Sequence, residues 1–173
     1  VNGMGLPWDW VDAEVARLAK RKAENMMPWV PLIANLCNSA TTRDEDKVVE
    51  FKRLMRKLYP YVDWFEINIS CPNQWWVCDI QKQEEKLRKL LSDLKRFNEQ
   101  LSLWNGSERK ALIVKIAPLT KHEEYRVEND WNWWNINVID ASSPLIRDLT
   151  TAWLELIARV CNEVWVDWVT ATN

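Results

Sequence analysis

The sequence predicts an α/β protein built on a parallel sheet, because helical and strand patterns alternate along the chain and the strands are rich in Val and Ile. Strands with continuous apolar character, such as 111–117, are typical of parallel sheets that are buried on both faces. Right-handed crossovers would connect such strands, and either a barrel or a doubly wound sheet fits this order.

The elements follow one another in a regular order. A helix is expected over 11–25, where apolar residues recur at helical spacing, and Pro28 ends the pattern before a strand at 31–36. Thr42 or Asp44 can cap a second helix that runs to Tyr59. The remaining expectations are strands at 64–70, 111–117 and 164–170, helices at 81–101 and 149–162, and an insertion at 119–146 with a short strand at 136–139.

Composition excludes several classes of function. The net charge is −2 and the charges are mixed, so no basic surface for nucleic acid or anionic lipid is indicated. No apolar run reaches the roughly 18 residues of a membrane span, and the sequence lacks a signal-peptide pattern, which favours a cytoplasmic protein. Four Cys residues without a CxxC pair and a single His predict neither a metal site nor a disulfide framework.

Polar residues gather where the predicted strands end. Asn35 is in the first strand, Lys115 is the single cation in an apolar strand, and others follow the later strands: Asn68, Ser70, Cys71, Asn73, Thr172 and Asn173. In α/β folds ligands bind at the carboxyl ends of the strands. Amide side chains donate and accept hydrogen bonds, which suits a flat, heteroatom-rich ring such as a pyrimidine or a flavin.

Four separated motifs carry a resemblance to a known family. They are VNGMGLP at 1–7, INISCPN at 67–73, VKIAP at 114–118 and TATN at 170–173. In this order and spacing the chain resembles the dihydroorotate dehydrogenase family. The resemblance implies that 1–173 is one partial domain of a (β/α)8 barrel, with about four β/α units of the eight, taken from a longer gene.

The resemblance also implies a role for each motif residue. Cys71 would be the general base, as in the class 1 enzymes, whereas class 2 enzymes carry Ser there. Substrate would be bound by Asn2, Met4, Gly5, Leu6, Asn68, Asn73 and Asn173. FMN would be contacted by Asn35, Asn68, Lys115 and Thr172. Without the motifs, Cys71 would be interpreted as a buried structural thiol and Lys115 as an edge-strand lysine.

The implied reaction is the flavin-dependent oxidation of dihydroorotate to orotate in pyrimidine biosynthesis. One alternative is a barrel similar to dihydropyrimidine dehydrogenase, whose loop shares the Ser-Cys-Pro stretch, although Asn73 favours dihydroorotate. Another is a half barrel without activity. The electron acceptor and the oligomeric state, including a homo-oligomer, stay open.

Tryptophan and glycine occur in unusual amounts, 13 Trp against 3 Gly. Average usage would give roughly a dozen Gly. In the resembled family Gly is typical at the positions of Trp10, Trp75, Trp76, Trp165 and Trp168. One hypothesis is that glycine codons, UGA in some bacterial lineages, have been read as tryptophan. The alternative is an aromatic-rich core or carbohydrate platform.

Overall fold

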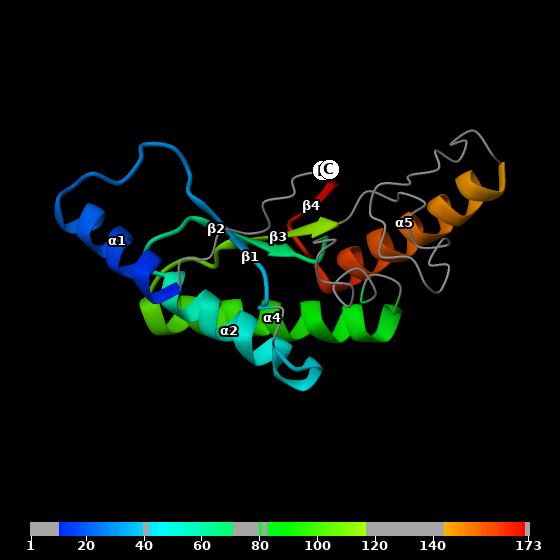
Figure 1. Cartoon of the computed structure of the whole chain (residues 1–173), viewed down its shortest axis with the longest axis horizontal. Coiled ribbons are helices and arrows are strands. Elements are labelled where there is room, and N and C mark those ends of the chain that lie inside the picture. Colours follow the sequence, from blue (N-terminus) through cyan, green and yellow to red (C-terminus); the bar gives the residue numbers. More distant parts are fainter. Residues whose placement is uncertain (1–10, 40–41, 71–79, 81–82, 117–143, 172–173) are drawn as a thin grey trace, which may run out of the picture.

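The computed structural model describes residues 11–39, 42–70, 80, 83–116 and 144–171. Helices and strands alternate in this part of the chain (Figure 1). Their order is α1 (Val11–Ala23), β1 (Ile33–Leu36), η1 (Asp44–Asp46), α2 (Lys47–Leu58), β2 (Trp64–Asn68), α4 (Glu84–Asn105), β3 (Ala111–Ile116), α5 (Pro144–Val164) and β4 (Trp168–Ala171).

The four strands form one parallel sheet in sequential order, β1-β2-β3-β4. The register pairs Asn35 with Glu66 and Asn68 with Lys115. Lys115 in turn pairs with Thr170. Side chains alternate between the two faces of a strand, so these residues all project from the same face. The predicted α/β class and its parallel sheet are therefore confirmed.

Helices cover the opposite face of the sheet, which we call the covered face. Phe65 and Ile67 of β2 and Leu112 and Val114 of β3 are fully buried there. The core continues into the helices through Met55, Leu87, Leu91, Leu94, Ile157 and Val160. Figure 1 shows α2 and α4 running along this side of the sheet. Burial of a Leu or Phe side chain contributes about 1.5–3 kcal/mol, so this layer is the main source of stability.

The other face, which we call the uncovered face, corrects the expectation that every strand is buried on both sides. Ile33 in β1 is 43% exposed and Trp168 in β4 is 56% exposed, both on this face. Glu66 and Lys115 are half-buried between them. Within the described residues the sheet is thus covered by helices on one side only.

Several predicted boundaries also differ. The last helix begins at Pro144 instead of 149, because Pro fits the first turn of a helix, where its missing N–H is not needed. Residues 144–146 therefore belong to α5 and not to the insertion, whose residues 119–143, including the expected strand at 136–139, lie outside the described part. Strand β4 starts at Trp168 instead of 164, since α5 continues through Val164. Asp46, rather than Thr42 or Asp44, precedes α2, and its side chain makes no capping hydrogen bond.

Candidate functional site

A cluster of polar side chains lies on the uncovered face, toward the carboxyl ends of the strands. We call it the polar cluster, and its members are Asn35, Glu66, Asn68, Ser70, Lys115 and Thr170. β2 supplies Glu66 and Asn68 because residues two apart in a strand share a face. Lys115 from β3 stands between Asn68 and Thr170 in the register. The cluster therefore draws on all four strands of the sheet.

A continuous chain of hydrogen bonds connects most of these side chains. Thr170 Oγ1 donates to Glu66 Oε1 at 2.8 Å, and Asn35 Nδ2 donates to the other oxygen, Glu66 Oε2. Asn68 Nδ2 then donates to Asn35 Oδ1 at 3.0 Å. At the end of the chain, Ser70 donates to Asn68 Oδ1 from its backbone N at 3.0 Å and from its Oγ at 2.9 Å.

This network fixes the orientation of two amides. Because a carboxylate only accepts hydrogen bonds, Glu66 requires Asn35 to present its NH₂ group, which leaves the Asn35 oxygen for Asn68. The Ser70 donors hold the Asn68 oxygen in place. Asn68 is only 4% exposed. Such a preoriented set of donors and acceptors is what recognition of a polar ring requires.

Aromatic rings flank the polar cluster on the same face. Trp64 and Trp168 pack edge to face, with ring centroids 5.4 Å apart and an interplanar angle of 61°. An aromatic pair next to amide and ammonium groups can contact the flat side of a heteroaromatic ligand while the polar groups address its edge.

The predicted site residues fall into two groups. Asn35, Asn68 and Lys115 are brought together on the uncovered face, as described above. The others lie outside the described residues: Asn2, Met4, Gly5, Leu6, Cys71, Asn73, Thr172 and Asn173. Cys71 directly follows Ser70, the last member of the hydrogen-bonded chain.

Glu66 and Thr170 were missed as site residues by sequence reasoning. Glu66 stands two residues before Asn68 in a strand, and this spacing alone places both on one face. The expectation that the strand was buried on both sides hid that signal. Thr170 begins the TATN motif, but no role was assigned to it.

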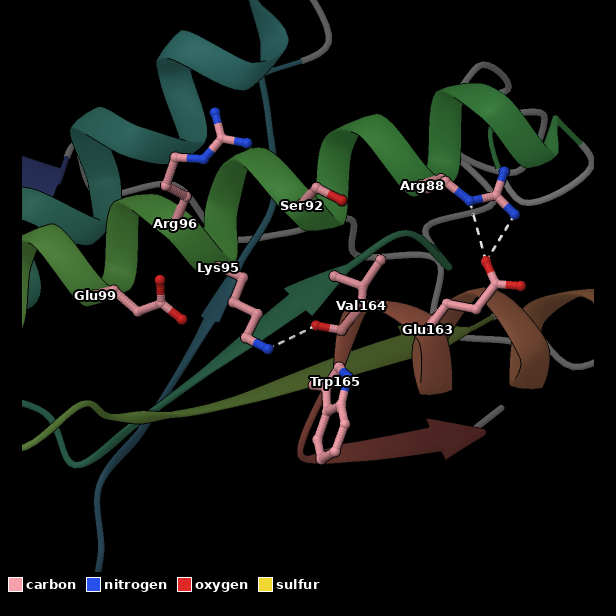
Figure 2. Close-up of a pocket in the computed structure, with 8 residues that line it drawn as sticks. All are labelled: Arg88, Ser92, Lys95, Arg96, Glu99, Glu163, Val164 and Trp165. Atoms are coloured by element: carbon pink, nitrogen blue, oxygen red, sulfur yellow. Dashed lines mark hydrogen bonds and ion pairs between the residues drawn. The ribbon is translucent and has the colours of Figure 1, made fainter.

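A concavity lies on the helical side, between α4 and the end of α5 (Figure 2). It has a volume of about 480 Å³. Two of its cations have partners: Arg88 pairs with Glu163 at 2.8 Å, and Lys95 Nζ donates to Val164 O at 2.8 Å. Arg88 also pairs with Glu84, and with Arg159 it holds the pKa of that carboxyl below its usual range, Arg159 having the larger effect. These contacts join α4 to α5.

The part of the chain that is described contains neither a candidate metal site nor a candidate membrane span. No group of three or more His, Cys, Asp or Glu side chains there could hold a metal ion. None of the helices described is long and apolar enough to cross a membrane.

The known proteins that are similar to this chain share one family name. The family model described as "Dihydroorotate dehydrogenase" matches residues 1–150. A protein of Xanthomonas axonopodis pv. citri (strain 306) named "Dihydroorotate dehydrogenase (quinone)" is 28% identical over the whole chain, which spans 39% of that relative. A protein of the same name from Stenotrophomonas maltophilia (strain K279a) is also 28% identical, with the same coverage.

The fold has a similar relative among solved structures. A crystal structure of DHODH from Eimeria tenella, in complex with ferulenol, matches with a TM-score of 0.70 and 21% identity. The match covers 100% of this chain and 42% of that structure, so the four β/α units correspond to part of a larger barrel. The family model covers most of the sequence, and on that basis the chain belongs to the dihydroorotate dehydrogenase family.

Proposed function

We propose that the protein containing this chain oxidises dihydroorotate to orotate with bound FMN, in the synthesis of pyrimidines. The chain spans about two fifths of the length of its curated relatives, so the activity is proposed for the whole protein. The observation that carries the proposal is the polar cluster, in which Asn35, Asn68 and Lys115 lie together at the carboxyl edge of a parallel sheet in a chain of this family.

The donor set of the cluster fits a flavin. Asn35 and Lys115 would hold the ring system, together with Asn68 and Thr172. FMN, when bound, supplies the acceptor for the hydride. Negative charge gathers on the reduced ring, and the Lys115 ammonium group on the same face would stabilise it electrostatically.

Substrate binding and proton transfer would fall to Asn68 and to motif residues that lie outside the described part of the chain. Asn68, Asn73, Asn2 and Asn173 would hydrogen-bond the dihydroorotate ring and carboxylate, with help from the backbone of 4–6. The Cys71 thiolate would take the proton from C5 while a hydride leaves C6 for the flavin. A thiol with a pKa of about 8.5 is a workable base near neutral pH when water is excluded.

The test uses protein expressed from the complete reading frame that contains this chain. We expect a yellow protein whose flavin absorbance bleaches anaerobically on addition of dihydroorotate. Bleaching by dihydrouracil instead would favour the dihydropyrimidine alternative, and a protein without flavin would contradict the proposal in favour of an inactive scaffold. Cys71→Ala should slow bleaching by orders of magnitude while orotate still binds. Bleaching at the wild-type rate would remove Cys71 from the mechanism.

The electron acceptor separates two classes. The named relatives are quinone enzymes, whereas Cys71 at the base position resembles class 1. Reoxidation of the reduced protein by a short-chain quinone and by fumarate, measured side by side, decides between them. Cytoplasmic location stays a prediction, which cell fractionation checks.

A further inference from the structure

Three of the helices described end in the same backbone arrangement. A residue just beyond the end of each helix has a positive φ: Asn25 at 54°, Gly106 at 59° and Trp165 at 60°. In each, the N–H of this residue bonds the carbonyl three residues back, and the next N–H bonds the carbonyl five residues before it. For the end of α5 these are Trp165 N to Asn162 O at 3.1 Å and Val166 N to Cys161 O at 2.9 Å.

The end of α4 is the matching case. Gly106 N bonds Leu103 O at 3.3 Å and Ser107 N bonds Ser102 O at 3.0 Å. This left-handed ending is usually made by Gly and sometimes by Asn, the residues found at 106 and 25. For other L-residues the Cβ crowds the following carbonyl oxygen, at a cost of roughly 1–2 kcal/mol. A bulky side chain in this region is an outlier.

Few contacts compensate for this cost at position 165. The Trp165 side chain is 76% exposed, and its described ring contact is with Lys95, whose Nζ lies 5.9 Å from the ring centroid. Figure 2 shows the indole at the margin of the surface pocket between α4 and α5. The backbone conformation at position 165 therefore favours glycine, and the contacts of the Trp165 side chain contribute little stability.

Exposure is common among the tryptophans of the described part. None of the six there is fully buried, and Trp29, Trp104, Trp165 and Trp168 are each more than half exposed. Tryptophan is on average a highly buried residue, because its large apolar surface favours the core. Within the described residues, four of the six tryptophans are thus left largely in solvent.

We infer that position 165 is a glycine site, and that the cell making this protein inserts glycine there by reading a UGA codon as glycine. Translation of the same codon as tryptophan gives the sequence with Trp165. Glycine at 165 would leave the turn into β4 unstrained. The turn matters for the site, since β4 begins three residues later and carries Thr170.

The gene sequence and the mass of the native peptide test whether the codon at position 165 is read as glycine. We expect UGA at position 165 of the gene and glycine in the peptide recovered from source cells by mass spectrometry. A UGG codon, or tryptophan in the native peptide, would overturn this half of the inference. Neither readout depends on flavin or on activity, so it stands apart from the proposed function.

Thermal unfolding of matched variants tests the glycine site itself. Trp165→Gly should raise the melting temperature by roughly 2–8 °C over the Trp165 protein, from the relief of left-handed strain. Trp153→Gly makes the same chemical change inside α5, at a half-buried residue packed against the core. It should lower the melting temperature, because Gly destabilises a helix interior.

The reciprocal variant Gly106→Trp should be destabilised to a similar extent as Trp165→Gly is stabilised. A melting temperature for Trp165→Gly equal to or below that of the Trp165 protein would contradict the glycine site. A Gly106→Trp variant with the same melting temperature as the parent would also contradict it.

Discussion

The two faces of the sheet differ in almost every physical respect, although the same strands build both. On the covered face Phe65, Ile67, Leu112 and Val114 are fully buried against α2, α4 and α5. On the uncovered face the alternate residues form the polar cluster beside the Trp64–Trp168 pair. The covered face supplies most of the buried apolar surface, and the uncovered face carries the proposed chemistry, so variants on adjacent residues should separate the two.

The largest stability effect is expected for Phe65→Ala on the covered face. Phe65 is fully buried and packs on Tyr59, with ring centroids 5.9 Å apart. Loss of the ring should reduce the free energy of unfolding by about 3–5 kcal/mol, as measured by urea titration. Its neighbour Glu66, on the uncovered face, is the control, and Glu66→Ala should cost about 1 kcal/mol or less. Equal losses would erase the distinction between the faces.

A smaller loss of stability is expected for a substitution at the amino ends of the strands, where aspartate side chains bind the backbone of a neighbouring strand. Asp167 accepts bonds from Arg109 Nη1 and Nη2 and from Leu112 N, each at 2.7 Å. The Arg109 hydrogen bonds hold the pKa of Asp167 below the usual 3.8. Asp167→Asn should therefore reduce the free energy of unfolding by about 1–3 kcal/mol at pH 7.

The pH dependence of this prediction has a definite sign. Since the folded pKa is lowered, the contribution of the carboxylate is complete above pH 3.8 and is lost as the pH falls through the folded value. The stability gap between Asp167→Asn and the parent should thus close in acid. Asp63 is the matched control, because it accepts Leu32 N at 2.7 Å in the same way and its described bonds include none from arginine. A gap that widens in acid would contradict the ion pair.

The least chemical modification is expected at Cys161, which lies in the core beneath the covered face. Burial raises the pKa of this thiol to about 11. Iodoacetamide at pH 8 should leave Cys161 unmodified in the folded protein and label it fully in urea, as read by peptide mass spectrometry. Cys71, in the proposed catalytic loop, should react first. Rapid native labelling of Cys161 would show that the covered face opens easily.

Sequence reasoning predicted the sheet well because the strands are rich in apolar residues and alternate with amphipathic helices. It predicted Asn35, Asn68 and Lys115 as neighbours because parallel strands bring their carboxyl ends to one edge. Glu66 was not found, because its strand was expected to be buried on both faces, and this hid the two-residue spacing that places it beside Asn68. The start of α5 was misjudged because Pro144 looks like a helix breaker unless its position in the first turn is known.

The separation of the two faces is tested most directly at the two ends of β3, by flavin reduction in protein from the complete reading frame. Lys115 lies on the uncovered face, whereas Lys110 precedes the strand at its other end, where it donates to Val62 O and stands 4.7 Å from the Tyr59 ring centroid. Lys115→Met should slow anaerobic reduction by dihydroorotate at least about 100-fold, because it removes the charge that we propose stabilises the reduced ring. Lys110→Met should lower stability and leave the rate unchanged, and a wild-type rate in Lys115→Met would contradict the account.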